Sequence, residues 1–446
     1  MRDILVTLIV AGIIPFIFRR PYIGVLLWVW LAVMNPHRLA YGFAYEDIPF
    51  AAIVGGVTLL SLFFSKDPKN LPLAPPVMVL IAFVLWMNVT TLFAIYPDLV
   101  YDQWNKVMKI MAFTFVTLML IKTKQQVQLL LVVILFSLCY YGVKGGVFTL
   151  TTGGVHMVLG PDDSFIAGNT EMALALVMII PLLHYFQVIS KKIWVRHSLT
   201  VVMVLCAMAS LGSYSRGALL AIAGMGLFLW LKSKYKFRIA LLFILALPLM
   251  LSFMPERWNE RMGTIQTYEQ DESVMGRFNA WGMAYNLAKD RPFVGGGFEI
   301  AEPGTFARYA PNKIDVPRAA HSIYFQALGE HGFVGLGLYL LFGFLTWRSG
   351  QWIIRNTRGL GEYQWASSLA SMIQVSFVGF AIGGAFFSLL YWDVPYYLMT
   401  AMVATRILVE KELVKQTAMA IPVKSTDSLR QLGKLNPSRA ITRDSG

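Results

Sequence analysis

A histidine lies where the chain passes from its longest polar stretch into an apolar segment, and its chemistry suits a general base or a hydrogen-bonding group that orients a nucleophile. His321 belongs to the sequence AAHSIYFQALGEHGFVGLG at 319–337, directly after the polar stretch 255–321. A titratable group is costly at a membrane boundary and usually has a function there. The positive end of the helix dipole favours a neutral imidazole that can accept a proton. The alternative is an interfacial histidine that only anchors the helix.

Two arginines are further candidates for a functional role, because each carries a fixed positive charge. Arg216 lies in the middle of the apolar stretch 199–231, and Arg277 lies in the long polar stretch, one helical turn before Trp281. A guanidinium binds phosphate oxygens through paired hydrogen bonds and keeps its charge at any working pH. The alternative for Arg216 is a snorkelling interfacial cation. The alternative for Arg277 is an ion pair with a preceding carboxylate (Glu269, Asp271 or Glu272).

The composition places these residues in a polytopic membrane protein. Hydrophobic residues make up 57% of the 446 residues and charged residues only 14%, whereas soluble domains are about a quarter charged. The net charge of +13 is gathered in alternate short loops, such as 191–197 and 232–238, and in the tail after Lys411. This alternation follows the positive-inside rule. The basic balance therefore reports topology and does not indicate a nucleic-acid partner.

Apolar segments predict an all-α fold with about 12 transmembrane helices. They occupy 4–18, 22–34, 49–64, 74–95, 104–121, 128–148, 165–187, 199–213, 216–231, 237–254, 322–347, 365–388 and 393–409. A spanning helix needs about twenty residues, fewer when it is buried, so either 12 or 13 spans are predicted. We divide the chain into N-terminal transmembrane helices (1–254), a large outward loop containing short helices (255–321), C-terminal transmembrane helices (322–410) and a disordered cytoplasmic tail (411–446).

The stretch 199–231 must break near its middle. It is too long for one span, and an arginine at the centre of a spanning helix costs about 2.5–3.5 kcal/mol. A turn at 212–217 makes two short helices and removes Arg216 from the membrane centre. Because the flanking loops are basic and hence cytoplasmic, this turn faces outside, on the same side as the large loop. Within that loop, Ser273 caps a predicted helix that runs through Arg277 and ends at 290–292, before the tight turn 294–298.

Three elements on one side of the membrane, taken in order, resemble the O-antigen ligase family. They are the turn SYSRG (213–217), the segment GRFNAW…RPFVGGGF (276–298) and the helix start at 319–337. Relatives of this family include O-antigen polymerases and protein-glycosylating oligosaccharyltransferases. The resemblance covers most of the chain and is firm in 165–390. The stretch MNPHRLAYGFAY (34–45) resembles a subgroup of O-glycosylation ligases found with exosortase systems.

The resemblance implies a GT-C-like glycosyltransferase of the bacterial inner membrane with a periplasmic active site. Such a protein moves a glycan from undecaprenyl diphosphate to an acceptor hydroxyl, here expected on lipid A-core during lipopolysaccharide biosynthesis. His321 matches the histidine at the acceptor hydroxyl, and Arg216 and Arg277 match the arginines at the donor diphosphate. Tyr324 and Arg318 are further candidates for substrate contact, although an interfacial tyrosine and a solvated loop charge are the default interpretations.

Neither a metal nor another cofactor is expected. Adjacent acidic pairs outside the large loop occur at 46–47 and 162–163, but such pairs more often solvate a loop or cap a helix. Two alternatives within glycan chemistry remain open, namely an O-antigen polymerase and a protein O-oligosaccharyltransferase. A lipid-linked glycan transporter is the alternative from another class, and it would usually show repeated halves and charges along a pathway through the membrane.

Overall fold

The computed structural model is helical throughout the part of the chain that it describes. The described residues are 1–40, 42–46, 48–66, 68–232, 236, 237, 241, 244, 245, 248, 252, 254–263, 272–313 and 315–420. Among them, six helices are long and apolar enough to cross a membrane, and two shorter apolar helices accompany these. The prediction of an all-α polytopic membrane protein is therefore confirmed.

The helices follow the predicted apolar segments, except that α15 runs past 347 and α17 past 409, so that residues 411–420 are helical where a disordered tail was predicted. Their bounds are α1 (Arg2–Arg19), α2 (Tyr22–Met34), η1 (Pro36–Leu39), α3 (Phe43–Glu46), α4 (Phe50–Phe64), α5 (Pro75–Leu92), α6 (Val100–Leu120), α7 (Lys124–Thr151), α8 (Asn169–Ile189), α9 (Ile193–Leu211), α10 (Arg216–Lys232), α12 (Glu256–Gly263), α13 (Glu272–Asp290), α14 (Pro303–Tyr309), α15 (Ile323–Asn356), η3 (Gly361–Tyr363), α16 (Gln364–Gly383), η4 (Gly384–Phe386) and α17 (Asp393–Ala420). The predicted segment 237–254 and the tail after 420 lie largely outside the described residues.

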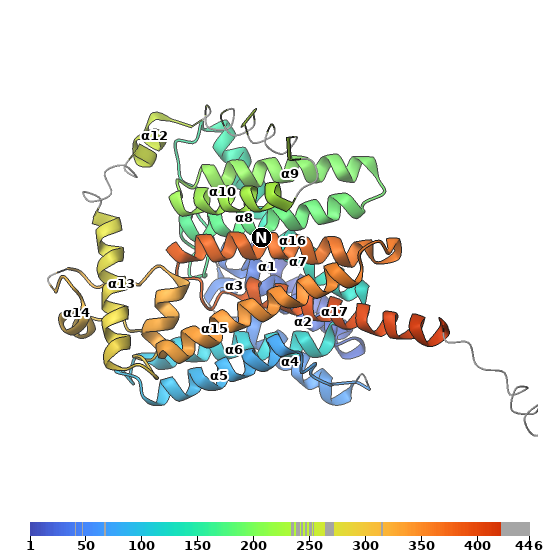
Figure 1. Cartoon of the computed structure of the whole chain (residues 1–446), viewed down its shortest axis with the longest axis horizontal. Helices are drawn as coiled ribbons and strands as arrows, with labels where there is room; N and C mark the ends of the chain where they lie inside the picture. The colour runs from blue at the N-terminus through green and yellow to red at the C-terminus, as the bar shows by residue number, and fades with distance from the viewer. Residues whose placement is uncertain are drawn as a thin grey trace, which may run out of the picture.

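The long helices form one bundle, and the helices of the large loop cover one of its ends. In Figure 1 the long helices run side by side, whereas α13 stands across their ends with α14 beside it. Contacts link distant parts of the chain, because α2 packs on α7, α5 on α15, and α6 and α7 on α17. The bundle therefore brings helices from both halves of the chain to the end that α13 covers.

Helix α15 is broken at Gly332, where we had expected one continuous span. Gly332 has φ +68° and ψ −172°, outside the helical region. The backbone N–H groups of Gly296 and Gly297 donate to the carbonyls of Gly329 and Glu330 at 2.8 and 2.9 Å. The loop that contains Gly296 and Gly297 is distant in sequence, and its N–H groups satisfy the carbonyls that the break leaves without helical partners. An added Cβ at Gly332 would clash with the backbone of that loop. The glycine-rich turn predicted at 294–298 is the part that docks there.

A buried polar network connects α15, next to its break, to α5 and to the segment between η4 and α17. The ring nitrogens of His331 lie 2.6 Å from the hydroxyl of Tyr391 and 2.7 Å from that of Thr90. The Tyr391 hydroxyl also donates to Glu330, and Trp86 donates to the backbone carbonyl of His331 at 3.0 Å. His331 is fully buried. Removal of the His331 side chain would leave the hydroxyls of Tyr391 and Thr90 each with one buried hydrogen bond fewer.

We expect His331→Ala to destabilise the bundle. A buried polar group that loses its partner costs about 1–3 kcal/mol, and the substitution also leaves a cavity. The melting temperature in detergent, followed by size-exclusion chromatography of heated samples, should fall by about 5 °C or more. His197→Ala is the matched control, since that side chain is exposed on α9. An unchanged melting temperature for His331→Ala would show that the network contributes nothing to stability.

Candidate functional site

The turn between α9 and α10 is held from several sides, and it presents Arg216 at the first position of α10. Ser215 caps α10, because its hydroxyl accepts the backbone N–H of Ala218 at 3.1 Å. The side-chain amide of Asn169 donates to the carbonyl of Ser213 at 2.6 Å, and the Tyr214 hydroxyl donates to a carbonyl of the preceding loop. The predicted break at 212–217 is confirmed, and its rigid backbone positions the start of the Arg216 side chain.

Arg216 and Arg277 line the same cavity, although they lie on different helices. The cavity has a volume of about 300 Å³ and lies between α10, α13 and η4. Its other walls are mostly apolar (Gly217, Leu220, Val274, Phe278, Trp281 and Phe386). Water-poor walls strengthen the attraction between a cation and a bound anion. The cavity therefore has the charge and the surroundings that suit an anionic group carried on an apolar chain.

Helix α13, which carries Arg277, also contacts the residues that precede α15. The indole N–H of Trp281 donates to the carbonyl of Ala320 at 2.6 Å, and its ring stacks on Phe325 at 5.0 Å between centroids. His321 follows directly, with φ +43° in the left-handed region that a side chain with a Cβ rarely adopts. Such a backbone costs about 1–3 kcal/mol and persists only where its surroundings enforce it. Trp281 thus joins the two-arginine cavity to the backbone of His321.

The environment of His321 favours its neutral form. Burial lowers the pKa of the ring below its usual value, the positive charges of Arg277 and Arg318 lower it further, and Glu171 at the start of α8 opposes them. In the described part of the chain, the ring makes no hydrogen bond. The direction of the pKa shift agrees with that expected from a helix dipole, but burial and the arginines are its main causes. A neutral imidazole with open nitrogens can accept a proton.

The other two predicted substrate contacts are engaged within the protein. Arg318 lies 3.5 Å from a carboxylate oxygen of Asp315 and donates to the carbonyl of Glu272 at 3.4 Å. The hydroxyl of Tyr324 donates to the carbonyl of Ala381 on α16 at 2.7 Å. Arg318 still acts on His321 through its charge, whereas Tyr324 joins α15 to α16. Their contact with a substrate stays a prediction.

The acidic residues considered as alternatives have varied surroundings. Asp163 pairs with Arg38 at 2.9 Å. Asp47 lies outside the described residues, as do two of the three carboxylates considered for Arg277. Within the described ranges, no three His, Cys, Asp or Glu side chains lie together as metal ligands would.

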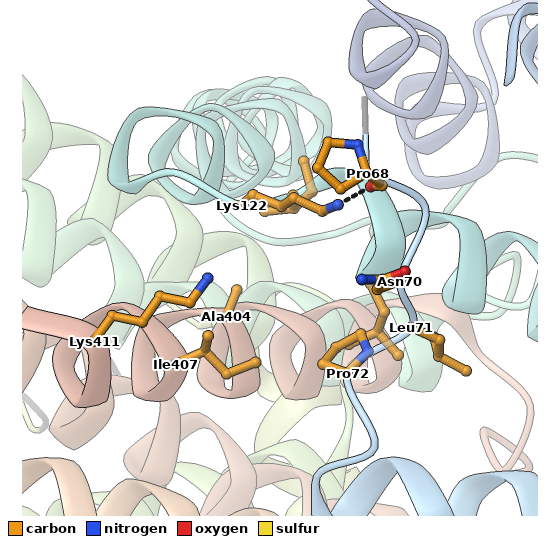
Figure 2. Close-up of a pocket in the computed structure, with 10 residues that line it drawn as sticks. Pro68, Asn70, Leu71, Pro72, Lys122, Ala404, Ile407 and Lys411 are labelled. Atoms are coloured by element: carbon orange, nitrogen blue, oxygen red, sulfur yellow. Dashed lines mark hydrogen bonds between the residues drawn. The ribbon is translucent and has the colours of Figure 1, made fainter. Parts of the chain in front are cut away.

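A second cavity lies at the opposite end of the bundle, between the loops that precede α5 and α7 and the last part of α17. Figure 2 shows Lys122 donating to the carbonyl of Pro68, while Lys411 points toward the same cavity of about 260 Å³. Its remaining walls are mainly apolar (including Leu71, Leu118, Ile121, Ala404 and Ile407). None of the predicted site residues lines it, so it is separate from the site at His321.

Sequence reasoning missed two contributors to the site. Glu171 was not singled out, although its charge acts on His321. Trp281 was placed on the face of Arg277 but without its partner Ala320. The polar triplet at 169–171, directly at the start of an apolar helix, was the available signal for Glu171. No sequence signal pairs Trp281 with Ala320, because that contact depends on how the large loop folds back.

Comparison with known families divides the chain into two parts. Residues 1–191 match a family of unknown function (DUF5935). Residues 201–340 match the O-antigen ligase family. A search of curated proteins found no match. Arg216, Arg277, His321 and both further candidates fall within the second part.

Proposed function

We propose that this chain, whose residues 201–340 match the O-antigen ligase family, transfers a glycan from a polyprenyl diphosphate to an acceptor hydroxyl. The observation that carries the proposal is the joining of Arg216 and Arg277 in one cavity whose wall residue Trp281 also holds the backbone before His321. Two fixed cations and a neutral base then flank a single reaction centre. The match to this family supports a ligase or polymerase type of activity. We propose the donor, the acceptor and the roles of the individual residues.

The donor diphosphate is assigned to the cavity between Arg216 and Arg277. As the bond between the anomeric carbon and the phosphate oxygen breaks, its electron pair moves onto the diphosphate. Two guanidinium groups stabilise that charge through paired hydrogen bonds, and the apolar walls make the attraction stronger than in water. The exposed side chain of Leu220 in the same wall suits the lipid that the diphosphate carries.

The acceptor hydroxyl is assigned to His321. Its oxygen attacks the anomeric carbon, while its proton moves to a ring nitrogen of neutral His321. The products are the new glycosidic bond, the polyprenyl diphosphate and a protonated imidazole, which then releases its proton to water. Direct attack inverts the anomeric centre and needs no covalent intermediate. The strained backbone at His321 supports a functional role, because strain of this kind concentrates at active sites.

We place this reaction at the periplasmic face of a bacterial inner membrane, with lipid A-core as the acceptor. The charge pattern of the loops supports the outward position of the site. The fold supports a multi-pass membrane protein. Membership of the exosortase-associated subgroup, resting on residues 34–45, stays a prediction.

Reconstitution tests the proposal directly. The purified protein in lipid nanodiscs, mixed with lipid-linked glycan and acceptor glycolipid extracted from a strain that lacks the protein, should form the joined product and release polyprenyl diphosphate. Deletion in cells should make the lipid-linked donor accumulate. If the protein instead moved intact donor across vesicle membranes without forming product, the transporter alternative would hold.

Transfer should continue in excess EDTA. Two arginines already offset the charge that develops on the diphosphate, and their charge does not vary with pH. We expect the initial rate in the reconstituted assay to stay within about twofold of the untreated rate. Loss of turnover on chelation, with recovery on adding Mg²⁺ or Mn²⁺, would contradict the arginine-centred mechanism and would direct attention to the acidic pairs at 46–47 and 162–163.

The pH profile of transfer should reflect the lowered pKa of His321. The base works only when neutral, so the rate should persist below the usual range of histidine and then fall as the pH drops through the lowered value. Arg318→Met removes a positive charge that lowers this pKa. Its acidic limb should therefore move to higher pH. An acidic limb that stays in place in this variant would show that His321 is not the titrating group.

A further inference from the structure

A lysine in the second turn of α6 is exposed, although α6 belongs to the helical bundle. The ammonium of Lys106 lies 4.1 Å from the ring centroid of Phe165, in the loop before α8. Within the described ranges it makes no ion pair or hydrogen bond. The charges of Asp393, Arg38, Asp163 and Glu299 nevertheless act on it. Lys106 therefore faces a group of charged side chains while its own N–H donors remain available.

The charged residues that act on Lys106 come from separate segments of the chain. Arg38 pairs with Asp163 at 2.9 Å, and the Tyr45 hydroxyl donates to the same carboxylate at 3.0 Å. The guanidinium of Arg38 also lies 5.1 Å from the centroid of the Tyr45 ring. We call Arg38, Lys106, Asp163 and Glu299 the Lys106 cluster. It combines hydrogen-bond donors and acceptors, and the rings of Tyr45 and Phe165 lie beside it.

Glu299 supplies an open acceptor from the other half of the chain. It lies in the loop that docks on the break in α15, is exposed, and has φ +58°. Partial burial of the carboxyl and the neighbouring Glu302 raise its pKa, while Lys106 opposes them. In the described part of the chain, its carboxylate makes no hydrogen bond. The strained backbone therefore holds a carboxylate toward Lys106 without pairing the two directly.

The Lys106 cluster lies at the same end of the bundle as His321. The loop that carries Asp163 leads into the first turn of α8, where the charge of Glu171 acts on His321. On α15, which begins two residues after His321, Glu330 interacts electrostatically with Glu299.

We propose that the Lys106 cluster binds the sugar residues of the acceptor that precede its reacting hydroxyl. The inference rests on the proposed function. Sugar hydroxyls donate to carboxylates such as Glu299 and accept from ammonium groups such as Lys106, and the C–H faces of sugar rings pack on aromatic rings. Arg38, Lys106 and Asp163 lie in the part that matches a family of unknown function. That part thus supplies three residues of the proposed acceptor-sugar site, and the O-antigen ligase part supplies Glu299, His321 and the donor site.

Two other interpretations fit the Lys106 cluster less well. A purely structural ion pair would bring the ammonium within contact of a carboxylate, as happens between Arg38 and Asp163. An anion site is disfavoured, because three negative charges (Asp393, Asp163 and Glu299) act at the lysine against one further positive charge, that of Arg38. The mixed charge separates this surface from the two-arginine cavity and favours a neutral, hydroxyl-rich ligand.

Steady-state transfer with each substrate varied in turn tests the inference. The probes are lipid-linked glycan and acceptor glycolipid extracted from the deletion strain. Lys106→Met and Glu299→Gln should raise the KM for acceptor about tenfold or more, with the KM for donor and the kcat near those of the wild type. Lys106→Arg should recover part of the loss, since it keeps the charge. Lys109→Met, exposed on the same helix, is the matched control and should behave as the wild type.

The outcomes separate this inference from the proposed function. If the wild type transfers glycan and Lys106→Met and Glu299→Gln keep its acceptor KM, the inference is wrong while the proposed function stands. A change confined to the donor KM would also overturn it. If the wild type forms no product at all, both the proposed function and this inference are wrong. Equal melting temperatures for wild type and variants exclude misfolding as the cause of a raised KM.

Discussion

Replacing His321 with alanine should lower the rate of glycan transfer by about 10²–10⁴-fold. The substitution removes the only group that we assign to the acceptor proton, so the hydroxyl must attack while still protonated. Donor binding should persist, because Arg216 and Arg277 line a cavity on the other side of Trp281. In cells, the lipid-linked donor should therefore accumulate while the variant inserts in the membrane at normal levels.

The control for this experiment is His156→Ala, since His156 is an exposed histidine in the loop that follows α7. It should transfer at the wild-type rate. His321→Ala should also bind the donor with unchanged affinity and give a single peak on size-exclusion chromatography. Wild-type amounts of transferred glycan from His321→Ala would remove its catalytic role and restore the interpretation of a histidine that only anchors a helix.

The parts of the fold that sequence predicted well are those governed by local free energy. The break at 212–217 followed from the cost of an arginine at the centre of one long span, and the helices α9 and α10 end and begin beside it. The face shared by Arg277 and Trp281 followed from helical periodicity, and both residues line one cavity. In each case the prediction depends only on a few residues that are neighbours in the sequence.

The parts that sequence did not predict depend on contacts between distant segments. The break at Gly332 is hidden in a continuous apolar pattern, because its stability comes from backbone hydrogen bonds of Gly296 and Gly297. The sequence also did not predict the exposure of Lys106, because the apolar pattern of its helix is that of an ordinary span. Its surroundings depend on the loop that carries Phe165, which lies beside it. Such contacts join residues far apart in the sequence, and one sequence carries no signal of which segments meet.

The substitution Arg216→Lys should impair transfer nearly as much as Arg216→Ala, by about 10²-fold or more. Arg216 lies at the first position of α10 and lines the cavity with Arg277, so a diphosphate between them can take two parallel hydrogen bonds from each guanidinium. A lysine keeps the charge but presents a compact ammonium that cannot reproduce the paired geometry. The measurement is kcat/KM for donor in nanodiscs.

The matched control is Arg355→Lys, at an exposed position near the far end of α15, which should leave transfer unchanged. Equal melting temperatures for Arg216→Lys and the wild type would show that the turn at 212–217 is intact. If Arg216→Lys were as active as the wild type while Arg216→Ala failed, positive charge alone would be needed at this position. Full activity of both variants would leave Arg216 as a snorkelling cation, and the diphosphate would then depend on Arg277, whose own substitution should in that case abolish transfer.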